Sequence, residues 1–190
     1  MEIVTVRDLL FWSYANLAMA HSAITSNAEK YSRIHFMVRS RLYNGLRKDS
    51  MQIGPLADDE RLKMILPQSC CYCGSKESLA ADHLIPRKKG GGHTGDNLVW
   101  ACRTCNSSKC ATDALEWLAG RQQFPPLLLL RRYLKLAIEL SREKGIMDLT
   151  LKEVPELPFA LSAVPTTFPQ PKSLRLWITE LPSVTAEPSQ

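Results

Sequence analysis

The sequence predicts a mixed fold in which α-helices flank a small cysteine-rich core. Three observations predict it. Apolar side chains recur at helical spacing on both sides of residues 67–111, and two C-x-x-C pairs lie within that stretch. Seven of the twelve prolines fall between Pro155 and Pro188, so an extended tail is expected there. With 190 residues, 45% of them apolar, the chain can bury one core of globular type.

Residues 1–66 are expected to form an N-terminal helical region. Helices are predicted over residues 5–20, 28–47 and 57–66 from the spacing of their apolar side chains. The apolar side of the second helix consists of Tyr31, Val38, Leu42 and Leu46. The third helix begins with three acids, which suit the positive end of a helix dipole, and it stops before Pro67.

The second predicted helix is also the most basic part of the chain. Residues 27–48 hold six cations against the single acid Glu29, an excess that equals the whole formal net charge of +5. Four of these cations are expected on one side of the helix: Lys30, Arg33, Arg41 and Lys48. Such a face favours contact with the phosphates of a polyanion, but a solvated helix face is the simpler interpretation, and both stay open.

Two further helices are expected over residues 112–145, packing on the core. Thr112 is predicted to cap a short helix that reaches Ala119, and Pro125-Pro126 to begin a longer one that runs to about Lys144. The buried stripe of the longer helix is predicted to be Leu127, Leu130, Leu134 and Ile138. Residues 146–190 are expected to form a Pro-rich, mostly irregular tail that docks only through residues 172–181.

No segment has the pattern of an export signal or a membrane span. Residues 9–20, LLFWSYANLAMA, are interrupted by polar side chains and follow the acids Glu2 and Asp8. The apolar runs are also too short to cross a bilayer. We therefore expect a cytoplasmic protein without membrane contact, whose six cysteines are metal ligands or reactive thiols before they are disulfides.

The cysteine spacing predicts a structural zinc site. Cys70 and Cys73 form one pair, Cys102 and Cys105 form the other, and 28 residues separate the inner cysteines. Four thiolates on two tight turns suit tetrahedral Zn²⁺. Because such a site has no open coordination position, it cannot activate water, and any chemistry must come from other residues. Cys110 is expected to be a plain small apolar residue.

Residues 82–109, DHLIPRKKGGGHTGDNLVWACRTCNSSK, hold a second pattern. His83 adjoins Asp82 and is followed by Asn97 fourteen residues on and by Asn106 nine further. Together with the cysteine pairs, this pattern resembles the HNH endonucleases, in the His-Asn-Asn variant whose zinc-ribbon members carry CxxCG, DHIIP, GG, NL and CN..K in this order. The resemblance covers residues 70–109, about a fifth of the chain.

The resemblance implies an α+β protein with a ββα-metal (HNH) core over residues 67–111. A strand would run into Asp82-His83, a second strand would cover residues 97–101, and a helix would begin near Cys105. Zinc would join the hairpin to this helix, and a second, catalytic cation would lie between them. Helices on the N- and C-terminal sides would complete the fold.

The side chains suit the roles that the resemblance implies. His83 has the right pKa range for a general base, and the oxygens of Asp82 and Asn106 suit a catalytic Mg²⁺ or Mn²⁺. By resemblance, Asn97 orients His83 or its loop and is not a ligand. Neighbours on a regular strand point to opposite faces, so the strand must end or twist at Asp82-His83 if both serve one site. His93 is expected to be a solvated loop residue.

Cations in and after the same loop are expected to hold backbone phosphates of DNA. These are Arg87, Lys88, Lys89 and Lys109, and three glycines, 90–92, would let the loop approach a duplex closely.

The activity implied is metal-dependent hydrolysis of DNA, as nicking or cutting of a duplex. A phage, a mobile element or an antiviral defence system is the expected context, with a protein partner such as an ATPase or sensor subunit. Two alternatives stay open: a nuclease subunit that is inactive without its partner, and a zinc-ribbon module that binds nucleic acid without catalysis.

Overall fold

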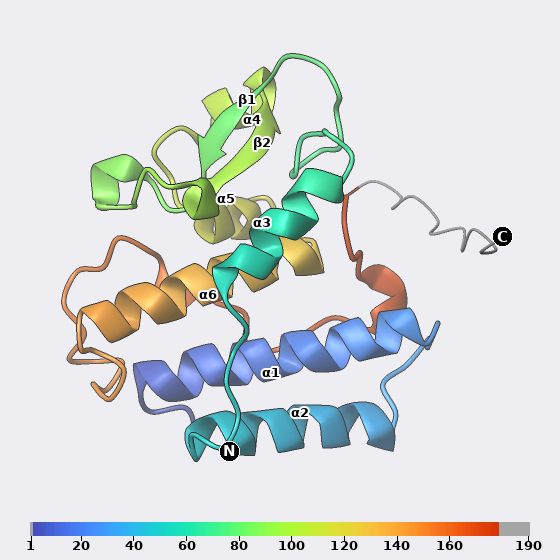
Figure 1. Ribbon diagram of the computed structural model, residues 1–190, viewed down its shortest axis with the longest axis vertical. Coiled ribbons are helices and arrows are strands. Elements are labelled where there is room, and N and C mark those ends of the chain that lie inside the picture. The colour runs from blue at the N-terminus through green and yellow to red at the C-terminus, as the bar shows by residue number, and fades with distance from the viewer. Residues whose placement is uncertain (1, 179–190) are drawn as a thin grey trace, which may run out of the picture.

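The computed structural model describes residues 2–178 and confirms the α+β class. This part of the chain holds six α-helices and one antiparallel pair of strands. Figure 1 shows helix α2 (Arg33–Arg47) at one end of the long axis and the pair of strands at the other, with α1 (Val6–Thr25) and α6 (Leu127–Glu143) between them. None of the described helices is both long and apolar enough to cross a membrane.

The first two helices pack along each other, as Figure 1 shows. A capping box begins α1, where the Thr5 hydroxyl accepts a hydrogen bond from the Asp8 amide at 3.1 Å. Helix α2 begins at Arg33, five residues later than predicted, so Lys30 precedes the helix instead of lying on it. Tyr43 and Leu46 supply its buried side.

Helix α6 is the centre of the fold. The four residues of its predicted stripe, Leu127, Leu130, Leu134 and Ile138, are all buried. Ion pairs join it to α3 (Leu56–Ile65): Asp59 accepts from Arg131 at 2.7 Å and forms a buried pair with Lys135, and Glu60 pairs with Arg132. Since breaking a buried pair leaves an uncompensated charge, these contacts hold α3 in one orientation on α6.

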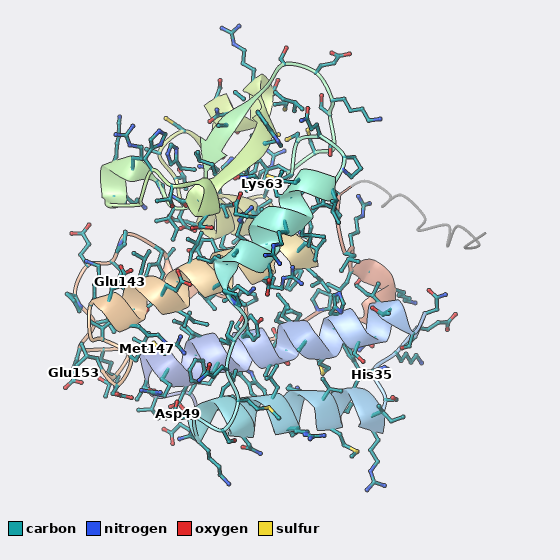
Figure 2. All side chains as sticks on the ribbon, viewed as in Figure 1. His35, Asp49, Lys63, Glu143, Met147 and Glu153 are labelled. Atoms are coloured by element: carbon teal, nitrogen blue, oxygen red, sulfur yellow. The ribbon has the colours of Figure 1, made fainter. Side chains whose placement is uncertain are left out.

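The hairpin and the helix after it form a ββα unit. Strand β1 (Leu79–His83) pairs with β2 (Leu98–Cys102), and α4 (Arg103–Lys109) packs on both strands. Lys63 ties this unit to α3, because its ammonium donates to the carbonyl oxygens of Gly95 and Leu98 at 3.2 and 3.1 Å. Figure 2 labels Lys63 at the end of α3 beside the hairpin.

Helix α5 (Ala114–Gly120) and its N-cap residue connect the ββα unit to α6. Asp113 caps it, not Thr112 as predicted, because one Asp113 oxygen accepts from the amides of Leu115 and Glu116. The other Asp113 oxygen accepts from the Tyr133 hydroxyl of α6 at 2.7 Å. Burial raises the pKa of Asp113. The Ala114 amide donates to the Leu84 carbonyl at 3.0 Å, next to the end of β1.

The chain from residue 146 to 178 is mostly irregular, as its prolines predict, but it is packed along its length. Thr150 forms an antiparallel bridge with Thr5, and the Trp12 indole donates to the Thr166 carbonyl at 2.9 Å. The expectation that only residues 172–181 dock is therefore wrong. Residues 179–181 lie outside the described residues.

Helix α4 ends at its C-cap residue Cys110, whose backbone conformation is unfavourable for a residue with a side chain. Cys110 is exposed and has φ 51° and ψ −127°, a region that glycine adopts without a steric penalty. The sequence predicted a plain small apolar residue here, and the structure adds that this residue is exposed and has an unfavourable backbone conformation. Glycine would therefore be favoured at this position, at the end of the helix.

Replacing Cys110 by glycine should raise the free energy of unfolding by about 1 kcal/mol, because relief of strain exceeds the added chain entropy. Urea denaturation of the zinc-loaded protein measures this change. Cys110→Ala is the control, since it removes the thiol but keeps the Cβ, and it should stay near wild type. Equal stabilisation by both variants would show that the thiol, not backbone strain, is the cause.

Candidate active site

The four cysteines of the two C-x-x-C pairs gather at one end of the ββα unit. Their sulfur atoms all lie within 4.8 Å of one another, and the Sγ atoms of Cys73 and Cys102 are 3.6 Å apart. Tetrahedral zinc with bonds of about 2.3 Å requires sulfurs roughly 3.8 Å apart, so the cluster suits one Zn²⁺. The amide of Cys105 donates to the Cys102 sulfur and lowers the pKa of Cys102 to about 7, which favours the thiolate that zinc binds.

Local backbone geometry brings the cysteines together. Cys70 and Cys73 lie on a tight turn in which the Gly74 amide donates to the Cys70 carbonyl at 2.9 Å, with Gly74 at φ 80°. Cys102 ends β2, and Cys105 lies in the first turn of α4. The cluster therefore connects the turn before β1 to both β2 and α4.

His83 lies at the end of β1 and is partly exposed. Its Nε2 is 2.9 Å from Nδ1 of His93, and the ring centroids are 5.1 Å apart. Partial burial lowers the pKa of His83, and His93 and Arg87 lower it further, which keeps the ring neutral and able to accept a proton.

His93 is the residue that the sequence reasoning missed. It lies in the exposed loop, as predicted, but it contacts His83 instead of only solvent. The chain leaves β1 after His83, reverses direction in the loop that begins near Pro86, and enters β2 at Leu98, which pairs with His83. Only this path brings a histidine ten residues later back to the first, and no spacing rule signals it.

Asn97 holds the loop that follows His83. Its side chain is 2% exposed, and its Nδ2 donates to the carbonyls of Ile85 and Gly92, both at 2.8 Å. Its Oδ1 accepts from the Ile85 amide at 2.9 Å. One buried amide therefore joins both ends of the loop, and Arg87, Lys88 and Lys89 lie exposed on the short helical turn between them.

Among the three glycines of this loop, Gly91 is the one where an added Cβ would clash with the backbone. A Cβ there would lie 2.1 Å from the Ile85 carbonyl oxygen, whereas at Gly92 the nearest atom, Thr94 Oγ1, would be 3.8 Å away. Gly91→Ala should therefore lower the free energy of unfolding by about 1–3 kcal/mol.

Chemical denaturation measures the effect of Gly91→Ala, with Gly92→Ala as the matched control that should stay within about 0.5 kcal/mol of wild type. Equal stability of both variants would mean that the loop moves freely and is not held as Asn97 indicates.

Asp82 points to the other side of β1 from His83. The two residues pair in regular register with Val99 and Leu98, so the strand neither ends nor twists before His83. The Asp82 side chain is 5% exposed; its Oδ2 accepts from the Tyr72 hydroxyl at 2.8 Å, and its Oδ1 lies 3.2 Å from the Lys109 ammonium. Burial raises the pKa of Tyr72 well above its usual value, so its hydroxyl stays a donor.

Lys109 does not lie on the surface. It is 1% exposed, and besides Asp82 it contacts the Thr112 carbonyl oxygen at 3.2 Å. This placement contradicts the predicted phosphate contact of Lys109, because a buried ammonium cannot reach a DNA backbone. Asn106 is half-buried one turn earlier on α4, which packs against β1.

The oxygens of Asp82 and Asn106 fit a hard divalent cation in their donor chemistry. A carboxylate has about four lone-pair sites, so the two contacts that Asp82 already makes leave lone pairs that a cation could use.

Residues 70–112 match the family model described as HNH endonuclease. The chain carries an HNH domain. Its ββα unit and cysteine cluster agree with the fold that the sequence predicted, and the domain points to a nuclease-type function. Comparisons with curated proteins and with solved structures gave no significant match. Helices α1, α2, α3, α5 and α6 lie outside the matched segment.

The cations predicted near α2 lie far from the HNH domain. Lys30, Arg33, Arg41 and Lys48 are all exposed. Figure 1 shows α1 and α6 between α2 and the strands. Contact of these cations with DNA phosphates stays a prediction.

Proposed function

We propose that this protein is a metal-dependent endonuclease that hydrolyses phosphodiester bonds in duplex DNA. The observation that carries the proposal is the position of His83. It is a partly exposed imidazole at the end of β1, and the loop that follows it presents three exposed cations and is held by Asn97.

In this mechanism His83 accepts the proton of the attacking water. Asn97 keeps the loop in place, so the position of His83 relative to the cations does not depend on substrate binding. Arg87, Lys88 and Lys89 bind the phosphates that flank the scissile bond, which sets the register of the DNA without reading its sequence. A divalent cation that stabilises charge on the phosphate and the leaving oxygen is part of the proposal, with Asp82 and Asn106 as its ligands. Because Asp82 faces the other side of β1 from His83, it would have to turn toward His83 when metal and DNA bind.

The test is incubation of supercoiled plasmid with zinc-loaded protein, with Mg²⁺, with Mn²⁺, or with neither. Conversion to open-circular or linear plasmid only when a divalent cation is added is the expected result. Single-stranded DNA and duplex RNA of matched length, assayed in parallel, check the preference for duplex DNA. Plasmid that stays supercoiled at every metal concentration, while the protein still binds it, would favour the non-catalytic binding module.

A nuclease that is held inactive is the second candidate. It is favoured by the contact between Lys109 and Asp82, because the proposed metal ligand already has a buried cation beside it. Cleavage that appears only after addition of a partner protein would support this candidate.

A further inference from the structure

A buried cluster of three side chains lies behind the strand that carries His83. We call Asp82, Tyr72 and Lys109 the Asp82 cluster. Its carboxylate accepts from the Tyr72 hydroxyl at 2.8 Å on one oxygen and lies 3.2 Å from the Lys109 ammonium on the other. All three residues are at most 5% exposed. Tyr72 is itself held in place by an edge-to-face contact with Trp117.

Lys109 balances the charge of Asp82. An ionised carboxylate that is removed from water is tolerated only with a partner, and Lys109 is the cation in contact with it. The neutral Tyr72 hydroxyl adds a hydrogen bond but no charge. The ammonium also donates to the Thr112 carbonyl, so it is held from two sides. The pair is therefore a built feature of the domain and not a chance surface contact.

The same carboxylate is the proposed ligand of the divalent cation. A dication that binds Asp82 meets the positive charge of Lys109 about 3.2 Å from the shared oxygen, in a site where water does not screen it. Like charges this close weaken binding, so Lys109 and the dication compete for Oδ1, whereas the Tyr72 hydroxyl can stay on Oδ2.

We propose that Lys109 is a resident counter-ion that keeps Asp82 in place and weakens the binding of divalent metal to the HNH domain. The inference rests on the proposed function, because it takes Asp82 as a metal ligand. Lys109 is thus a positioning residue that acts through Asp82 and touches neither DNA nor the reacting atoms. Phosphates of bound DNA add negative charge beside the site, so DNA and metal should each strengthen the binding of the other.

The test measures Mn²⁺ binding to zinc-loaded protein, by the EPR signal of free Mn²⁺, in wild type and Lys109→Met. Methionine has a similar length but no charge. The variant should bind Mn²⁺ roughly 10- to 100-fold more tightly. Without Mn²⁺ its melting temperature should fall by about 10 °C, because Asp82 is left unpaired, and Mn²⁺ should restore most of that loss.

Two variants serve as controls. Lys76→Met removes the same charge from an exposed residue of the HNH domain and should leave Mn²⁺ affinity unchanged. Asp82→Asn, added to Lys109→Met, should abolish the gain in Mn²⁺ affinity, which shows that the gain passes through Asp82.

Mn²⁺ affinity of Lys109→Met equal to or below that of wild type would overturn the inference. If the variant does not fold on its own, refolding by Mn²⁺ supports the inference, and failure of Mn²⁺ to refold it overturns it. Tighter Mn²⁺ binding by Lys109→Met, in a protein whose wild type never cleaves plasmid, would support the counter-ion role and contradict the proposed nuclease activity.

Discussion

Replacing His83 by alanine should lower the rate of plasmid cleavage by roughly 100-fold or more, which is the usual contribution of a positioned general base. The protein should keep its fold, its zinc and its affinity for DNA. His83 is partly exposed, contacts His93 in the loop and is remote from the cysteine cluster, so the smaller side chain leaves no large buried cavity.

The measurement is single-turnover cleavage of supercoiled plasmid at matched metal and salt, beside zinc content, melting temperature and binding to a labelled duplex. His21→Ala is the matched control, because His21 is a half-buried histidine on α1, outside the HNH domain, and this variant should cleave at the wild-type rate. Wild-type cleavage by His83→Ala would exclude this residue as the base and, with it, the proposed site.

The parts of the site that the sequence predicted are those whose function depends on local spacing. Two C-x-x-C pairs require two turns, and the positions of His83, Asn97 and Asn106 follow from the resemblance to one compact unit. Predicted helices were also found where apolar periodicity was strong, as in α6. Helix starts were less predictable, because capping depends on which side chain reaches the amides: Asp113 did so, and Thr112 did not.

The parts that the sequence did not predict depend on how separate elements meet. Lysine is ordinarily a surface residue, so nothing in the sequence around Lys109 predicts that its ammonium is buried against Asp82, on the strand before the loop. The contact of His93 with His83 depends on the path of the loop, and the distance of α2 from the HNH domain depends on two intervening helices. Each depends on how elements pack in three dimensions and leaves no periodic pattern in the sequence.

Mutation of the cysteine cluster should disrupt the fold, whereas mutation of His83 should remove cleavage and leave the fold intact. Cys73→Ser removes one of the four proposed zinc ligands in the cluster that connects the turn before β1 to α4. Binding of structural zinc contributes directly to folding free energy, of order 10 kcal/mol in small zinc domains. The variant should therefore lose its zinc and melt roughly 10 °C or more below wild type, with cleavage lost because the HNH domain is disordered.

Elemental analysis and thermal unfolding measure these changes, and wild type should hold one zinc per chain. Cys110→Ser is the matched control, since Cys110 is exposed like Cys73 but lies outside the cluster, and it should retain full zinc. One zinc and a wild-type melting temperature in Cys73→Ser would show that the cluster does not hold structural metal. Loss of zinc and fold in Cys73→Ser, beside loss of cleavage alone in His83→Ala, would separate two roles within one domain: the cysteines stabilise the ββα unit, and the histidine at the end of β1 performs the chemistry.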